Sequence, residues 1–156
     1  MLLGAGALGS TLAELLVRNG LRVGHVFDGD RVEGGNLTRH TALLINAGEH
    51  KASAVVARLN LSNPHAALIP HVGEYPPKDA KLGRATLLCD LIVDATAETA
   101  VLRELAREER QATLFASIWL GFRGRRTYVY LARGSRFPFS PLHSRDRHPS
   151  ARAITT

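Results

Sequence analysis

Short apolar runs alternate along this chain with stretches in which apolar residues recur every three or four positions. Short runs favour β-strands, whereas the three-to-four spacing places apolar side chains on one face of a helix. The expected strands are residues 1–3, 22–28, 66–72, 90–94, 113–118 and 127–131. The expected helices are one with Leu8, Leu12, Leu15 and Leu16 on its apolar face, one over about 48–61 and one over 98–110. This alternation predicts an α/β fold with a doubly wound, mostly parallel, Rossmann-like sheet.

Two connections in this pattern have unusual lengths. Only residues 1–3 precede the first turn, although a strand normally has about five or six residues. We therefore expect either that the chain begins inside a longer gene product or that its start has been assigned wrongly. The loop over residues 29–47 is long for a compact domain, and such loops are usually functional.

A glycine-rich turn follows the first expected strand. Gly4, Gly6 and Gly9 have the Gly-x-Gly-x-x-Gly spacing, and Asp28 stands at the end of the second expected strand. In a nucleotide-binding βαβ unit the first glycine allows a tight turn, the second lets the backbone approach a phosphate, and the third lets helix and strand pack closely. The acid binds ribose hydroxyls. The combination predicts an adenine-nucleotide site, although the glycines alone are also compatible with a structural turn.

Length and composition are those of one domain. The chain has 156 residues, 45% of them hydrophobic, and we expect residues 1–133 to form the nucleotide-binding domain and residues 134–156 to be a disordered or truncated tail. No apolar run approaches the ~20 residues needed to cross a membrane, and no signal peptide is apparent. Cys89 is the single cysteine, which excludes an internal disulfide and favours a cytoplasmic location.

The net charge of +6 comes largely from arginines in the last third of the chain. They are Arg123, Arg125, Arg126, Arg133, Arg136, Arg145, Arg147 and Arg152. Aromatic residues are not interleaved with them as in an RNA-binding sheet, so we expect solvated arginines and no specific nucleic acid. An acidic protein partner or ATP phosphates are the alternative partners for this charge.

Three further segments accompany the glycine turn. Asp28-Gly29-Asp30 is followed by Asn36-Leu37-Thr38-Arg39-His40, then by Gly48-Glu49-His50-Lys51, and finally by Val93-Asp94-Ala95-Thr96. In this order, over residues 2–131, the set resembles the ThiF/MoeB/HesA family, the adenylating domain of ubiquitin-activating-type enzymes. The Asn-Leu-x-Arg element is the most specific part of the resemblance.

The resemblance implies an ATP-dependent adenylyltransferase that activates the C-terminal carboxylate of a ubiquitin-like or sulfur-carrier protein ending in Gly-Gly. It implies that Gly4, Gly6, Gly9, Asp28, Asp30 and Asn36 contribute to the nucleotide site. Arg39 and Lys51 would hold phosphates and serve catalysis, Arg39 as a planar fork and Lys51 as a point charge. Mg²⁺ would bridge phosphate oxygens near Asp94. A homodimer is also implied.

The chain departs from the family pattern at three places. Where the family has a magnesium-binding aspartate, this chain has Ala97, followed by Glu98. The downstream thiol and the paired cysteines of a structural zinc site are absent from this sequence. The family's N-terminal arginine, which reaches into the partner's site, is also absent, as expected for a truncated start.

These departures leave two alternatives open. A catalytically impaired pseudo-enzyme or scaffold of the same fold would explain Ala97 and the missing thiol. A nicotinamide-dependent oxidoreductase would use the glycine turn and Asp28 equally well, but it would leave the Asn-Leu-x-Arg element unexplained.

Overall fold

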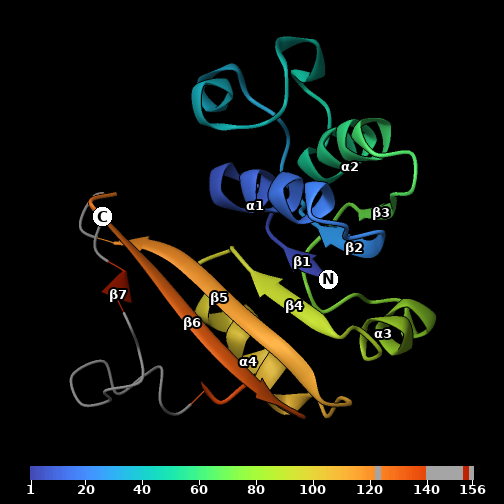
Figure 1. Cartoon of the computed structure of the whole chain (residues 1–156), viewed down its shortest axis with the longest axis vertical. Coiled ribbons are helices and arrows are strands. Elements are labelled where there is room, and N and C mark those ends of the chain that lie inside the picture. Colours follow the sequence, from blue (N-terminus) through green and yellow to red (C-terminus); the bar gives the residue numbers. More distant parts are fainter. Residues whose placement is uncertain (122–123, 140–152, 155–156) are drawn as a thin grey trace.

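The computed structural model describes residues 1–121, 124–139 and 153–154, and in this part of the chain seven strands form one sheet (Figure 1). The strands are β1 (Leu2–Leu3), β2 (Val23–Phe27), β3 (Ala67–His71), β4 (Leu91–Asp94), β5 (Thr113–Gly121), β6 (Arg126–Gly134) and β7 (Ala153–Ile154). Their order is β3-β2-β1-β4-β5-β6-β7. The pairings from β3 to β5 are parallel, and those of β6 with β5 and β7 are antiparallel. The expected mostly parallel α/β sheet is confirmed.

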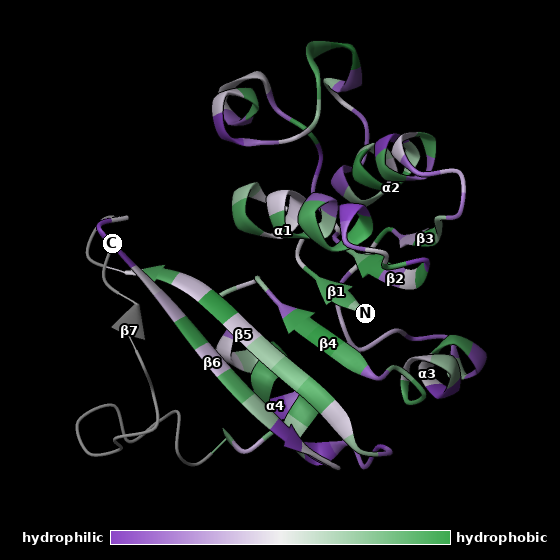
Figure 2. Ribbon diagram, in the orientation of Figure 1, coloured by the Kyte–Doolittle hydropathy of each residue, from purple (hydrophilic) through white to green (hydrophobic). Residues whose placement is uncertain are grey.

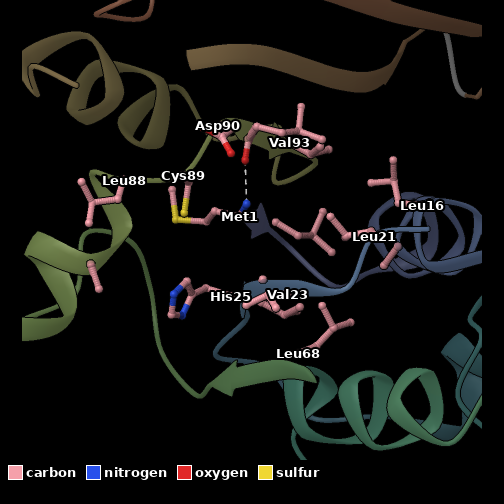
Figure 3. A pocket seen from close by; sticks show the side chains of 16 residues that line it. Met1, Leu16, Leu21, Val23, His25, Leu68, Leu88, Cys89, Asp90 and Val93 are labelled. Atoms are coloured by element: carbon pink, nitrogen blue, oxygen red, sulfur yellow. Dashed lines mark hydrogen bonds between the residues drawn. The ribbon is translucent and has the colours of Figure 1, made fainter. Parts of the chain in front are cut away.

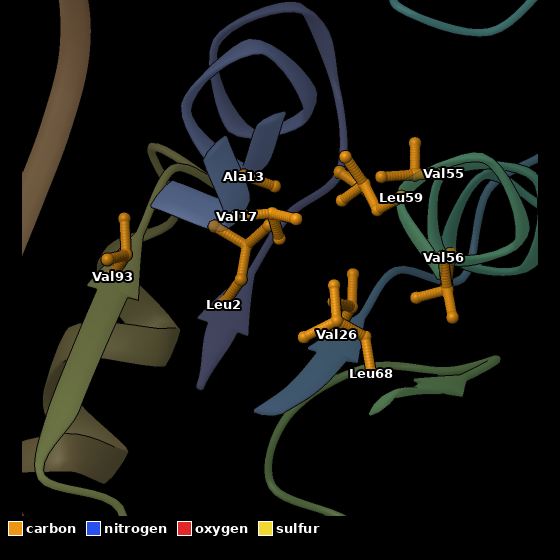
Figure 4. Close-up of a cluster of buried hydrophobic side chains, with 11 residues drawn as sticks. Leu2, Ala13, Val17, Val26, Val55, Val56, Leu59, Leu68 and Val93 are labelled. Carbon is orange, nitrogen blue, oxygen red and sulfur yellow. The ribbon is translucent and has the colours of Figure 1, made fainter. Parts of the chain in front are cut away.

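Helices cover both faces of the sheet. The described α-helices are α1 (Ala7–Arg18), α2 (Lys51–Ser62), α3 (Ala80–Thr86) and α4 (Thr99–Arg107). Successive strand residues point to opposite faces, so each strand feeds two cores. Leu2, Val26 and Val93 join the α1 and α2 side chains in one cluster, shown in Figure 4. Their neighbours in the strands, including Leu3 and Phe27, join the α4 side chains in the other.

The apolar strands explain why the sheet is buried on both faces near its centre. In Figure 2 the ribbons of β1 and β4 are mostly hydrophobic, as is typical of parallel strands covered by helices. None of the helices in the described ranges is both long and apolar enough to span a bilayer.

The long loop after β2 is folded. It contains two short 3₁₀ helices, η1 (Gly34–Arg39) and η2 (Leu44–Asn46). A third apolar cluster of Val32, Ala42 and Ala54 fastens the loop to α2, and the Val32 amide donates to the Glu49 carbonyl at 2.8 Å. The loop thus returns the chain to the start of α2 through a defined path.

Several expected boundaries differ from the structure. The hydrophobic pattern predicts no helix between residues 72 and 90, but α3 begins at Ala80, where the Asp79 carboxylate caps the helix by accepting from the Leu82 amide at 2.7 Å. The helix expected over 98–110 ends at Arg107, and Arg110 turns inward. Strand β5 continues three residues beyond the expected 118.

The folded unit also continues past the boundary expected at residue 133. Phe137 is buried in the second core, and its amide donates to the Leu105 carbonyl at 3.2 Å. Ser135 accepts from the Arg110 amide at 2.9 Å. Most of the expected tail, residues 140–152 and 155–156, lies outside the described residues.

Candidate functional site

The sheet reverses its strand order between β1 and β4, and this switch point positions the site. The chain leaves β1 for α1 and β2 on one side, whereas β4 lies on the other side of β1. Ligands of open α/β sheets bind in the crevice beyond the strand ends at such a point. The turn after β1 and the segment after β4 are therefore expected to line the ligand site.

The three glycines of the turn have three different surroundings. Gly4 has φ +84°, and a Cβ there would lie 3.1 Å from the Ala95 and Thr96 backbone beyond β4. A Cβ on Gly9 would lie 1.9 Å from the Gly4 carbonyl oxygen, so Gly9 is required for the helix to pack against the turn. A Cβ on Gly6 would meet nothing within 4 Å. Gly6 therefore leaves open space beside the turn.

Helix α1 presents an uncapped amino terminus to this space. Its N-cap residue is Gly6, no side chain caps the first turn, and no acidic residue lies in that turn. The first amides of a helix have no intrahelical acceptor, and the helix dipole adds partial positive charge there. The arrangement is suited to an anion such as phosphate.

Asp28 braces the glycine turn. One carboxylate oxygen accepts from the Ala5 amide at 2.7 Å, and the other accepts from the Asp30 amide at 2.8 Å. Hydrogen bonds to an ionised carboxylate are strong, so this pair fixes the turn against the end of β2. Each oxygen keeps further acceptor capacity for a ligand.

Lys51 is joined to the same turn through Asp30. Its ammonium lies 2.7 Å from an Asp30 carboxylate oxygen, and its amide donates to the Asp30 carbonyl at 2.9 Å. The Lys51 side chain is only 12% exposed, whereas that of Asp30 is 75% exposed. Hydrogen bonds therefore run without a break from Ala5 through Asp28 and Asp30 to Lys51.

The segment over η1 carries Asn36 and Arg39 and ends next to the glycine turn, which His40 contacts. His40, which follows Arg39 directly, has its Nε2 atom 2.6 Å from the Ala5 carbonyl oxygen. Arg39 is exposed, and within the described residues its guanidinium has no hydrogen bond or ion pair. Asn36 is half-buried, and its backbone N–H donates to the Glu33 carbonyl. Arg39 is thus available to a ligand.

Asp94 serves as a brace rather than as an open metal ligand. It is 2% exposed, and its oxygens accept from the Thr96 amide and hydroxyl at 3.1 and 2.6 Å and from the Ser117 hydroxyl at 2.8 Å. Across the part of the chain that the structure describes, no group of three His, Cys, Asp or Glu side chains could hold a metal. Asp94 is thus buried and already hydrogen-bonded, and the magnesium site expected there stays a prediction.

Ala97 occupies a conformation that alanine disfavours. Its φ is +60°, the left-handed region that glycine, asparagine and aspartate tolerate better. Glu98, the other acid near this position, is exposed, and its amide donates to the Thr96 hydroxyl at 3.1 Å. Ala97 adopts this left-handed backbone conformation, but its side chain carries no atom that could bind a metal.

A cavity of about 330 Å³ lies at the opposite end of the sheet. Figure 3 shows Met1, Val23, His25 and Cys89 around it, all at or near the amino-terminal ends of strands. The Met1 amino group donates to the Leu91 carbonyl beside it at 2.6 Å. This apolar cavity is therefore separate from the candidate site.

Sequence reasoning missed the roles of two residues in this region. The motif that contains His40 does not specify its contact, and in the structure His40 contacts the glycine turn directly. Ser117 on β5 holds Asp94, a contact that depends on strand pairing and leaves no local signal. The position of His40 beside Arg39 in a specific motif was the one available clue to its contact.

Comparison with known proteins decides the family. The family model described as "ThiF family" matches residues 1–154. The chain belongs to the ThiF family. The resemblance found in the sequence motifs is confirmed.

One curated relative of this ThiF-family chain is the ATP-dependent ubiquitin transferase-like protein Cap2 of Enterobacter hormaechei subsp. hoffmannii (strain UCI 50). The two are 31% identical over 146 residues, which cover 93% of this chain and 24% of Cap2. The chain thus spans about a quarter of the length of this relative.

Two solved structures have the same fold. Escherichia coli TcdA, a tRNA N6-threonylcarbamoyladenosine dehydratase solved with AMP, has a TM-score of 0.59 and 25% identity over 68% of this chain and 45% of TcdA. E. coli MccB, solved with ATP, has a TM-score of 0.68 and 15% identity over 86% of this chain and 39% of MccB. The likeness to MccB is evidence for the fold alone.

Proposed function

We propose that this chain is an ATP-dependent adenylation domain that activates the C-terminal carboxylate of a ubiquitin-like or sulfur-carrier protein. The observation that carries the proposal is the unbroken set of hydrogen bonds from Ala5 through Asp28 and Asp30 to Lys51. These bonds connect the Lys51 ammonium group, whose side chain is mostly buried, to the open glycine turn. Family membership and relatives named for, or solved with, ATP or AMP add support.

In the proposed reaction, a carboxylate oxygen of the carrier attacks the α-phosphorus of ATP. The bond from that phosphorus to the oxygen bridging to the β-phosphate breaks, and pyrophosphate leaves with the bond's electron pair. Both reactants are anions, so the protein contributes positioning and neutralisation of charge rather than covalent chemistry.

Each site residue has a proposed role in this reaction. Gly6 and the α1 amino terminus receive phosphate, and Asp28 binds the ribose with its remaining acceptor capacity. Lys51 and Arg39 neutralise phosphate charge, with Asp30 holding Lys51 and Asn36 contributing its amide. Of the two cationic groups, only Lys51 has a carboxylate partner among the described residues that it could exchange for phosphate.

Asp94 has no metal step in this proposal. Its carboxylate already accepts three hydrogen bonds, so it keeps the loop after β4 in place beside Gly4. The same observation, together with Ala97, favours a second candidate function. That candidate is a pseudo-enzyme or scaffold that binds nucleotide without activating a carrier.

Carrier-dependent exchange of pyrophosphate into ATP tests the proposal, and it needs a small protein ending in Gly-Gly as the partner. Arg39→Ala and Lys51→Ala should each abolish exchange because each removes a phosphate-neutralising charge. Arg22→Ala and Lys81→Ala are matched controls, since both side chains are exposed and Arg22 precedes β2 at the opposite end of the sheet.

The possible results separate the two candidates. Normal exchange in both Arg39→Ala and Lys51→Ala would contradict the proposed roles. Nucleotide binding by the wild type without any carrier-stimulated exchange would favour the scaffold. The same assay with candidate carriers would test the identity of the carrier. The homodimer is also part of the proposal, and the mass of the purified protein in solution would test it.

A further inference from the structure

His40 occupies a special position between the two halves of the proposed site. Its Nε2 atom lies 2.6 Å from the Ala5 carbonyl oxygen in the glycine turn, and its Nδ1 atom lies 2.9 Å from the Ala42 amide nitrogen. Ala5 is therefore hydrogen-bonded on both sides: its amide donates to Asp28, and its carbonyl accepts from His40. Asp28 is linked through Asp30 to Lys51, and His40 directly follows Arg39 in the chain.

The two partners of His40 define its proton arrangement. The Ala42 amide can only donate, so Nδ1 must be the acceptor. The Ala5 carbonyl can only accept, so Nε2 must carry the proton and donate it. The neutral ring with its proton on Nε2 satisfies both contacts, whereas a ring protonated on both nitrogens would lose the bond from Ala42.

Other contacts do not hold η1 as directly. None of its residues is buried, and Leu37 packs only partly against the cluster of Val32, Ala42 and Ala54. Thr41 adds a longer bond from its amide to the Ser10 hydroxyl at 3.4 Å, and its own hydroxyl is buried with no partner among the described residues. The short bond from His40 is thus the main polar link between the end of η1 and the glycine turn.

We propose that His40 is a positioning residue that holds Arg39 at the phosphate site by tying η1 to the glycine turn. This inference rests on the proposed function, because Arg39 must act on a phosphate for its position to matter. His40 itself contacts no reacting group in this scheme. Its Nε2–H donates to the Ala5 carbonyl, and this bond fixes the backbone of Arg39, the residue that precedes His40.

Three substitutions separate the two hydrogen bonds of the ring. His40→Gln keeps a donor at about the place of Nε2, His40→Asn keeps an acceptor at about the place of Nδ1, and His40→Ala keeps neither. ATP affinity, measured by titration calorimetry on the purified chain, should fall about fivefold to tenfold in His40→Asn and His40→Ala, as expected for one lost hydrogen bond. His40→Gln should stay within about threefold of the wild type.

A double-mutant cycle distinguishes positioning from general stabilisation. In an Arg39→Ala background, His40→Ala should weaken ATP binding no further, because the group that it positions is gone. A purely structural role would give the same loss in both backgrounds. That result, or equal affinities for His40→Asn and the wild type, would overturn the inference.

Hydrogen exchange keeps the inference testable if the wild type fails to bind ATP. Such a failure would count against the proposed function alone. Amides of residues 34–42 should exchange faster in His40→Asn than in His40→Gln if His40 anchors the segment. Equal protection of these amides in both variants would contradict the anchoring role of His40, whatever the result of the ATP titration.

Discussion

Individual residues of the site act mainly through backbone geometry. Gly9 is required because a Cβ would collide with the Gly4 carbonyl oxygen, Gly4 is favoured by its φ of +84° and by the crowded backbone beside it, and Gly6 leaves space open. Asp28 was expected to bind ribose, and the structure adds that its carboxylate fixes the turn through Ala5. A spacing rule identifies these positions because the steric demand is local. The contacts of Asp28 and His40 with Ala5 were beyond it, because both partners meet only after β1 and β2 pair.

Ala97 provides a prediction at the residue scale. Its left-handed backbone costs alanine more than glycine, so Ala97→Gly should raise the free energy of unfolding by about 0.5–1 kcal/mol, after allowance for glycine's extra entropy in the unfolded chain. Urea denaturation measures the change. Ala100→Gly, in the regular helix α4, is the matched control and should lower the free energy by up to about 1 kcal/mol. Destabilisation by both substitutions would contradict the strained conformation.

At the scale of elements, strand pairing creates contacts that the hydrophobic pattern does not reveal. β2 and β3 lie parallel, and the His25 Nδ1 atom is 2.8 Å from the His71 Nε2 atom. His71 also stacks on Phe27 at a centroid distance of 4.5 Å. The two strands were expected from sequence, but the contact needs their register.

The histidine pair predicts a pH dependence of stability. Burial lowers the pKa of both His25 and His71 below the usual 6.5, and the positive charges of the N-terminus and of His25, respectively, lower them further. The folded state therefore binds fewer protons than the unfolded state at pH values between the lowered pKa and about 6.5. Stability from this pair is complete above that window and is lost as the pH falls through it.

Urea denaturation at pH values from about 7.5 to 5 checks this sign. His71→Gln should flatten the loss of stability toward acid, because one of the two groups that resist protonation is gone. His65→Gln is the matched control, since His65 is exposed and outside the pair. An unchanged acid slope in His71→Gln would show that the pair does not contribute.

The element scale also shows where the sequence pattern failed. The sequence pattern did not predict helix α3, because the only indication of this helix is the N-cap residue Asp79 within a stretch rich in Pro and Gly. Helix α4 was expected to reach residue 110, but Arg110 is buried and donates to the Thr86 carbonyl at 2.6 Å and to the Tyr75 hydroxyl. Tertiary contacts that recruit a charged residue into the interior are not visible in helical periodicity.

At the scale of the whole molecule, the strand order explains why the site forms. β1 and β4 are neighbours although they are far apart in sequence, so the glycine turn and the Asp94 segment lie side by side. The alternation of strands and helices predicted the layers and the sheet type. It could not predict the burial of Phe137, because the residues after 133 resemble a polar tail in composition and the contacts of Phe137 with the second core depend on the tertiary structure.

The central claim is that the glycine turn and Lys51 together bind the phosphates of ATP. Titration calorimetry with ATP on the wild type, Lys51→Ala and the exposed-lysine control Lys81→Ala tests it most directly. We expect ATP to bind the wild type and Lys81→Ala equally, and to bind Lys51→Ala at least about tenfold more weakly, as expected for a lost charge-assisted hydrogen bond. A wild type that does not bind ATP, or a Lys51→Ala variant that binds it as well as the wild type does, would contradict the account.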